Sequence, residues 1–110
     1  MKTVLAVDFD GTLCKDGFPH PQGAVPNVNL FKELIAAQKH GAVIILWTCR
    51  GGQLLQEAVD YCKEQGLEFD YVNENDPDLM KAMDFDHEPR KIVATKYIDD
   101  AAIVPKWEEE

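Results

Sequence analysis

Residues 3–12 read TVLAVDFDGT, an apolar run that ends abruptly in two aspartates, a glycine and a threonine. An uninterrupted apolar run of this length is typical of a strand that is buried on both faces of a parallel sheet. Gly11 lets the chain turn at once, and Thr12 can hold that turn through a hydroxyl-to-backbone hydrogen bond. We therefore expect a buried strand with Asp8 and Asp10 at its carboxyl end.

The rest of the chain alternates further apolar runs with amphipathic stretches of helical period. The segment 13–26 is rich in Gly and Pro and predicts an irregular loop or a short hairpin. Alternating strands and helices predict a parallel sheet with right-handed crossovers, here a three-layer, Rossmann-like α/β domain over residues 1–110 with helices on both faces. The expected strands cover 3–7, 42–47 and 69–72, and a fourth lies within 92–98. Helices are expected between Asn27, as N-cap, and Gly41, before Gly66, and for a turn or two around 79–83.

Composition excludes several classes of partner. Eleven basic residues against twenty acidic ones give a net charge of −9. This charge disfavours long nucleic acids and anionic membrane surfaces, and no apolar run approaches the ~20 residues of a membrane-spanning helix. The cysteines form no CxxC pair, which favours a reduced, cytoplasmic protein without disulfides or structural zinc: Cys14, Cys49 and Cys62.

Polar side chains stand at the carboxyl ends of three expected strands. Asp8 and Asp10 follow the first, Thr48 follows the second, and Asp99 and Asp100 follow the fourth. Ligands of doubly wound sheets bind beyond this edge, and extended backbone puts the first two aspartates on one face, about 7 Å apart. We therefore expect these side chains to converge on one site.

Converging carboxylates repel one another unless a cation lies among them. An all-oxygen ligand set without clustered His or Cys suits Mg²⁺. Magnesium beside a strand-end carboxylate indicates phosphoryl chemistry, in which an aspartate attacks phosphorus and forms an aspartyl-phosphate. A lone DxDG would be no more than a turn signal, but a second strand ending in IDD, at residues 98–100, argues against that interpretation.

The motifs resemble those of the haloacid dehalogenase (HAD) superfamily. DFDGTL at 8–13 is similar to its first motif, the strand ending in Thr48 to its second, and YIDD at 97–100 to its fourth. The order is the same and the match spans most of the chain. LWTCR at 46–50, followed by a helix, further resembles small stand-alone HAD-type hydrolases. The resemblance implies a HAD-type fold and a Mg²⁺-dependent phosphatase.

The resemblance also implies a role for each motif residue. Asp8 would be the nucleophile, and Asp10 the general acid for the leaving group and then the base for water. Thr48 would bind a phosphoryl oxygen. Asp99, with Asp100, would ligate Mg²⁺ together with Asp8 and the main-chain carbonyl of Asp10.

The remaining substrate contacts are expected around the second motif. Arg50 follows Thr48 at the start of a helix, where free N–H groups and the helix dipole favour anions, so we expect it to contact phosphate; a surface ion pair is the alternative. Gly11 and Cys49 complete the expected substrate-binding set, and packing is the favoured role of the cysteine over nucleophilic work.

The third motif of the superfamily is a lysine that neutralises the nucleophile and the phosphoryl group. Lys81, Lys91 and Lys96 all precede the acidic pair. Lys91 aligns best with relatives, which carry lysine eight residues before the pair. If 92–98 were fully extended, Lys91 would lie about 26 Å from that pair, at the wrong end of the sheet. Choosing it therefore predicts a short strand with 90–94 looping back, and a straight strand would favour Lys81.

The sequence also indicates an open site. About 15 residues separate Asp10 from the first expected helix, and no folded insertion fits between Thr48 and Asp99, so we expect no cap domain. An open site favours a large phosphorylated substrate, or a neighbouring subunit of a homo-oligomer, to exclude water. A phosphorylated sugar, nucleotide, lipid-linked glycan or protein residue all remain compatible with the sequence.

Two other function classes are compatible with these residues. A signalling module resembling a receiver domain also uses Asp, Thr, Lys and Mg²⁺ on a parallel sheet. Its acidic pair follows the first strand and its phosphoacceptor a later one, the reverse of the order here. A non-catalytic domain that binds a metal or a partner would keep the same side chains without turnover.

Overall fold

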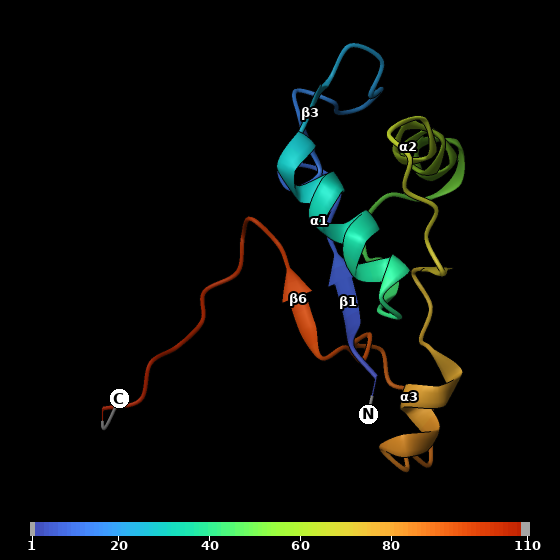
Figure 1. Cartoon of the computed structure of the whole chain (residues 1–110), viewed down its shortest axis with the longest axis vertical. Coiled ribbons are helices and arrows are strands. Elements are labelled where there is room, and N and C mark those ends of the chain that lie inside the picture. The colour runs from blue at the N-terminus through green and yellow to red at the C-terminus, as the bar shows by residue number, and fades with distance from the viewer. Residues whose placement is uncertain (1, 109–110) are drawn as a thin grey trace.

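Four strands form one parallel sheet in the order β5-β4-β1-β6 in the computed structural model, which describes residues 2–108 (Figure 1). A separate antiparallel pair, β2 and β3, lies in the segment before the first helix. The strands are β1 Val4–Val7, β2 Cys14–Lys15, β3 Val25–Pro26, β4 Val43–Leu46, β5 Tyr71–Val72 and β6 Lys96–Ile98, and the helices are α1 Val28–Lys39, α2 Gly52–Glu64 and α3 Pro77–Ala82.

The register of the sheet brings three strand ends together. Val7 at the end of β1 pairs with Leu46 of β4 on one side and with Ile98 of β6 on the other. The ladder continues one residue further, since the Asp8 N–H donates to the Ile98 carbonyl at 2.9 Å and the Trp47 N–H to the Val7 carbonyl at 2.8 Å. The residues that follow β1, β4 and β6 therefore share one edge.

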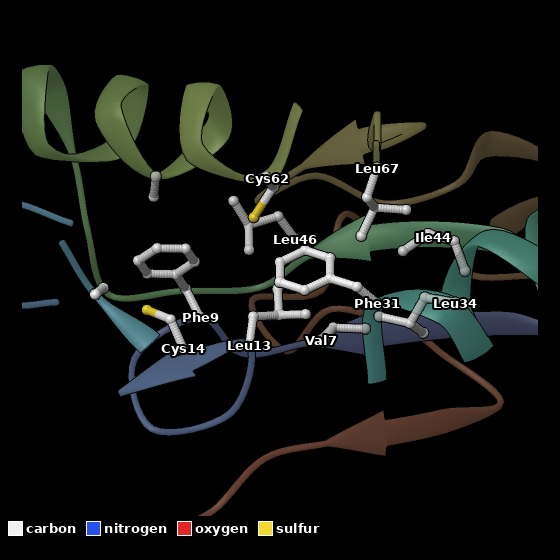
Figure 2. Close-up of a cluster of buried hydrophobic side chains, with 12 residues drawn as sticks. Val7, Phe9, Leu13, Cys14, Phe31, Leu34, Ile44, Leu46, Cys62 and Leu67 are labelled. Atoms are coloured by element: carbon white, nitrogen blue, oxygen red, sulfur yellow. The ribbon is translucent and has the colours of Figure 1, made fainter. Parts of the chain in front are cut away.

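Helices flank the sheet on both faces, which confirms the α/β fold with a parallel sheet. On one face, Val7 and Leu46 pack with Phe31 of α1 and Cys62 of α2 in the larger core cluster (Figure 2). On the other face, the smaller cluster joins residues of β1 and β4 to the short helix α3 and to the chain before β6: Val4, Ala6, Ile45, Leu79 and Ile92. The second face is thus covered by less helix than the first.

Side-chain caps set two of the helix starts. The Asn27 side chain accepts the Leu30 N–H at 3.3 Å at the start of α1, as the sequence predicts, and Gly41 adopts φ +98° just beyond the end of that helix. At α3, the buried Asp76 carboxylate accepts the Leu79 N–H at 3.1 Å. The helical turns expected around 79–83 are confirmed, beginning slightly earlier.

The expected strand over 69–72 is too long, because β5 covers Tyr71–Val72, whereas the strand expected within 92–98 is short, as the choice of Lys91 predicts. In the second case, Thr95 replaces part of the ladder: its hydroxyl accepts the Val4 N–H and donates to the Val4 carbonyl, both at 2.8 Å. The Val93 N–H donates to the Asn75 side chain at 2.7 Å, and Ile92 turns into the core. These side-chain contacts restrict β6 to three residues, as the choice of Lys91 requires.

The chain after β6 forms no helix or strand through residue 108 and runs away from the sheet (Figure 1). Three of its large apolar side chains are exposed: Ile103 at 90%, Val104 at 86% and Trp107 at 75%. Between residues 2 and 108, no helix has both the length and the apolar character needed to cross a membrane.

Candidate active site

Three carboxylates meet at the shared strand edge. Asp8, Asp99 and Asp100 can each offer an oxygen such that all three lie within 4.8 Å of one another. Thr12 ties the group together, because its hydroxyl donates to Asp8 Oδ2 at 3.3 Å and accepts the Asp100 N–H at 3.0 Å. The structure therefore brings together the predicted nucleophile and the predicted acidic pair, and adds Thr12, which the sequence marked only as a turn residue.

Gly11 makes room for the acidic pair. Its φ is +80°, and a Cβ placed on it would overlap the carboxylate of Asp100. A side chain here would strain the backbone and displace that carboxylate. The Asp100 carboxylate occupies the place of a Gly11 side chain, and the expected contact of Gly11 with substrate stays a prediction.

The three carboxylates of the cluster repel one another. Burial raises the pKa of Asp8 to about 6, and the negative charges of Asp99 and Asp100 add to the effect. Hydrogen bonds from the Phe9 N–H and the Thr12 hydroxyl oppose it. All donors are carboxylate oxygens, the set that hard divalent cations prefer, so the cluster fits Mg²⁺.

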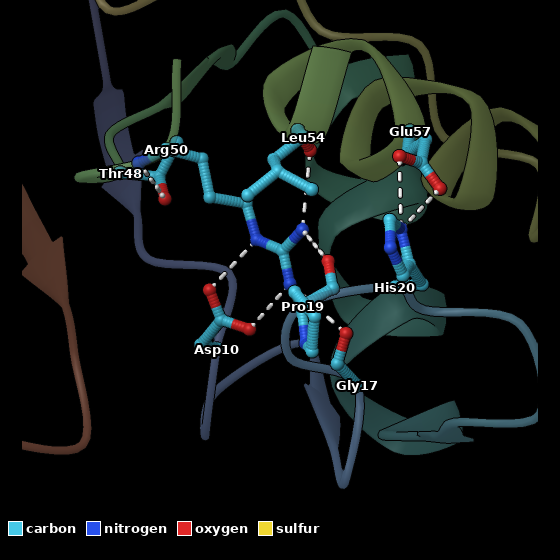
Figure 3. A network of polar contacts seen from close by, with 8 residues as sticks. All are labelled: Asp10, Gly17, Pro19, His20, Thr48, Arg50, Leu54 and Glu57. Carbon is cyan, nitrogen blue, oxygen red and sulfur yellow. Dashed lines mark hydrogen bonds and ion pairs between the residues drawn. The ribbon is translucent and has the colours of Figure 1, made fainter. Parts of the chain in front are cut away.

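Arg50 forms a buried network around Asp10 (Figure 3). Its Nε donates to Asp10 Oδ2 and its Nη2 to Asp10 Oδ1, both at 2.8 Å, which makes a bidentate pair. The remaining N–H groups donate to main-chain carbonyls: Pro19 at 2.8 Å, Leu54 at 3.1 Å and Gly17 at 3.0 Å. The side chain is only 2% exposed.

This network corrects the expectation that Arg50 contacts phosphate. A guanidinium carries five N–H donors, and here all five have protein acceptors. Its central carbon also lies 4.8 Å from the Phe9 ring centroid and 5.2 Å from that of Phe18, and the hydrogen bonds to Asp10 raise the pKa of Arg50 further. The alternative, an ion pair, is confirmed in part, because Arg50 pairs with the partly exposed Asp10 while its own side chain is buried. Arg50 instead holds Asp10 against the loop 17–19 and α2.

Asp10 does not join the acidic cluster through its side chain. Both of its carboxylate oxygens accept hydrogen bonds from Arg50, and the cluster found among residues 2–108 contains Asp8 but not Asp10. A metal contact through the Asp10 main-chain carbonyl, which the HAD resemblance implies, stays a prediction.

Thr48 is held by a residue that the sequence analysis missed. Its N–H donates to Asn73 Oδ1 at 2.9 Å, and its hydroxyl accepts the Arg50 N–H at 3.2 Å. Asn73 directly follows β5 and adopts φ +53°. A polar residue after the third strand was the available signal. Cys49, the neighbour of Thr48, is exposed and unpaired by disulfide, and its expected contact with substrate stays a prediction.

The structure separates the three candidate lysines. Lys91 and Lys96 line a cavity of about 660 Å³ that also contains Asp8 and Asp99. Lys81 lies in α3, which begins near the opposite end of the sheet, where Lys2 pairs with Asp76 at 3.2 Å and with Asp78 at 3.0 Å. Lys81 is therefore disfavoured, and the short β6 brings the cavity within reach of Lys91.

A solved structure described as a conserved protein from Bacteroides thetaiotaomicron is similar to this chain. The two share 32% sequence identity with a TM-score of 0.74, and the match covers 97% of this chain and 84% of that one. No protein-family model matches the chain, and no curated protein does.

Proposed function

The chain belongs to the same family as that conserved Bacteroides thetaiotaomicron protein, and we propose that it is a Mg²⁺-dependent phosphomonoesterase acting through an aspartyl-phosphate on Asp8. The observation that carries this proposal is the grouping of Asp8 with Asp99 and Asp100 at one strand edge, beside a cavity lined by Lys91 and Lys96. A nucleophile, an oxygen-only metal cluster and cations for the phosphoryl group together favour phosphoryl transfer over the other function classes.

The chain's own residues divide the reaction between them. An Asp8 oxygen attacks phosphorus and forms an acyl-phosphate bond while the bond from phosphorus to the leaving oxygen breaks; water then cleaves the acyl-phosphate and restores the carboxylate. Thr12 holds Asp8 Oδ2. The Thr48 hydroxyl, whose proton has no acceptor in the described part of the chain, donates to a phosphoryl oxygen. The ammonium of Lys91 balances the charge of that group.

Asp10 serves as the acid and base of this scheme. Each of its oxygens accepts one hydrogen bond from Arg50 and keeps a lone pair, so Asp10 can exchange a proton with a leaving group or water while Arg50 fixes its orientation. We assign Arg50 to positioning Asp10 rather than to binding substrate.

Magnesium would be held by Asp8, Asp99 and Asp100, with the main-chain carbonyl of Asp10. When bound, it supplies positive charge that offsets the repulsion among these carboxylates and the phosphoryl group. The raised pKa of Asp8 supports this assignment, because a cation removes the like-charge repulsion that contributes to it.

The proposal extends to the superfamily, the absence of a cap, the location and the oligomeric state of the chain. We assign the chain to the HAD superfamily, as a three-layer, Rossmann-like member without a cap domain. The segment between Asp10 and α1 carries only the β2–β3 pair, which supports the absence of a cap there. The free cysteines favour a cytoplasmic location. Because the site is open, we also propose that a second copy of the chain covers it.

The test is phosphate release from a panel of phosphomonoesters in excess Mg²⁺, followed by addition of EDTA and then by restoration of Mg²⁺. We expect release that EDTA stops and Mg²⁺ restores. Failure across the whole panel would contradict the proposal. Stable phosphorylation of Asp8 by acetyl phosphate without turnover would favour a signalling module, and Mg²⁺ binding without either reaction would favour a non-catalytic domain.

The stability of the folded chain should depend on pH through Asp8. The pKa of Asp8 is about 6 in the folded chain, above its ordinary value, so the folded state favours the protonated carboxyl. The wild type should therefore lose stability relative to Asp8→Asn as the pH rises from about 4 to above 6. We expect a difference of about 1–2 kcal/mol after allowance for the partial exposure of Asp8. Thermal melting at pH 4.5 and 7.5 measures it, and Mg²⁺ should stabilise wild type at pH 7.5 more than the variant. A pH-independent difference would refute this assignment.

Replacing Lys91 with methionine should lower kcat/KM by about 10²-fold, because the phosphoryl charge would lose a cation in a partly enclosed cavity. The matched control is Lys81→Met on α3, for which we expect no change. Lys96→Met identifies the alternative: if it removes activity while Lys91→Met does not, Lys96 is the third-motif lysine. Steady-state kinetics on the best substrate of the panel measures all three variants.

A further inference from the structure

The cavity beside Asp8 has an apolar and aromatic wall. Its volume is about 660 Å³, and Trp47 at the end of β4 and Tyr97 of β6 line it together with the chain after β6, including Ile103 and Val104. Ile103 and Val104 are 90% and 86% exposed, so they border the cavity and do not pack into the core. Rings and aliphatic groups beside a nucleophile provide a surface for an apolar part of a substrate.

Charged side chains also line this cavity. Asp8 and Asp99 are at the metal cluster, and Lys91 and Lys96 add two cations, in a chain with a net charge of −9. The Lys91 ammonium lies 4.9 Å from the centroid of the Tyr97 ring, and the Tyr97 hydroxyl donates to the Ile92 carbonyl at 2.5 Å. Tyr97 is thus held in place by two contacts. A phosphoryl group at Asp8 would leave the ester group facing the apolar wall.

The chemistry of the leaving group also favours a ring. Each oxygen of Asp10 accepts one hydrogen bond from Arg50, and a leaving group of low pKa needs the least help from such an acid. A phenol has a pKa of about 10, as tyrosine does, against about 15.7 for water, to which aliphatic alcohols are closer. A phenolic oxygen therefore departs more easily than an alkoxide when the phosphorus–oxygen bond breaks, with its proton supplied by Asp10.

We propose that the substrate is an aryl phosphomonoester whose ring packs against Trp47, Tyr97 and the chain at 102–105. This inference rests on the proposed phosphatase function and assigns the substrate class of the same site. It also gives the chain after β6 a role, as one wall of the cavity. A small aryl phosphate and a phosphotyrosyl peptide share this chemistry.

Binding of non-hydrolysable phosphonates tests the ring pocket without any leaving-group chemistry. With Mg²⁺ present, calorimetry should give phenylphosphonate at least tenfold tighter binding than methylphosphonate, and Trp47→Leu should remove most of that ratio. Ile103→Ser should reduce the ratio as well, and its exposure makes a folding defect an implausible cause. Val28→Ser is the control, at an apolar position on α1 that is 51% exposed and lies outside the cavity. Equal binding of the two phosphonates would overturn the proposal.

Turnover then distinguishes peptide substrates from small aryl esters, and it tests the substrate class separately from the proposed reaction. Trp47→Leu should lower kcat/KM for 1-naphthyl phosphate at least tenfold more than it lowers kcat/KM for glycerol phosphate. A phosphotyrosyl peptide as good as naphthyl phosphate would identify protein substrates, and a poor peptide would identify small aryl esters. If phosphate is released but Trp47→Leu affects both esters equally, the substrate class is wrong and the function stands. If nothing is hydrolysed while the phosphonate ratio holds, the pocket is right and the proposed reaction is wrong.

Discussion

Replacing Asp8 with asparagine is expected to lower phosphate release by at least about 10³-fold, to the background of the assay, while the chain stays folded. An amide nitrogen cannot attack phosphorus as a carboxylate does, and no acyl-phosphate can form. Folding should survive because asparagine keeps the size of the side chain and removes one charge from the cluster of Asp8, Asp99 and Asp100. Colorimetric phosphate release, with circular dichroism and urea unfolding on the same samples, measures both effects.

The combination of lost activity and kept or improved stability separates a nucleophile from a structural residue, whose replacement would lower both. The control is Asp16→Asn, the same change at an exposed loop position whose φ of +59° asparagine tolerates. We expect full activity from that variant. Substantial activity in Asp8→Asn would mean that another group attacks phosphorus, and the assignment of the site would have to be abandoned.

The second large effect concerns Arg50. Arg50→Lys is expected to reduce the free energy of unfolding by about 2–4 kcal/mol, because one ammonium cannot satisfy the carboxylate and three main-chain carbonyls. The Arg50 side chain is 2% exposed and its hydrogen bond to the Gly17 carbonyl is buried, so that carbonyl would have little access to water. Urea denaturation measures the change. Arg90→Lys at an exposed position is the control, with an expected change within about 0.5 kcal/mol.

Arg50→Lys should also lower kcat by about 10²-fold with a smaller change in KM, because Asp10 would lose its fixed orientation while the acidic cluster and the lysines of the cavity remain. A shift in the pH profile of kcat would accompany the loss, since Asp10 is the proposed acid and base. A variant that is destabilised but keeps the kcat and pH profile of wild type would reduce Arg50 to a purely structural residue.

Much of the strand edge could be predicted from local patterns. Continuous apolar runs indicated β1 and β4, and the residues after them are adjacent in the chain to the runs themselves, so Asp8 and Thr48 had to lie at the strand ends. The IDD motif likewise predicted that Asp99 and Asp100 follow the end of β6. The parallel register then brought Asp99 beside Asp8.

The length of β6 could not be predicted in this way. Residues 92–98 have the composition of a strand, but Thr95 and Asn75 supply side-chain hydrogen bonds that interrupt the ladder, and Ile92 turns into the core. The strength of these contacts depends on partners from distant parts of the chain. The position of Lys91 beside the cavity follows from them.

The amino-acid sequence by itself determined the order of strands and helices, the acidic strand ends and the class of chemistry they favour, because each depends on residues that are neighbours along the chain. Only the tertiary structure decided what those residues touch. Arg50 pairs with Asp10 across 40 positions and Thr12 with Asp100 across 88. The physical reason is that a buried donor must find an acceptor, and which acceptor lies within reach is set by the packing of the whole chain.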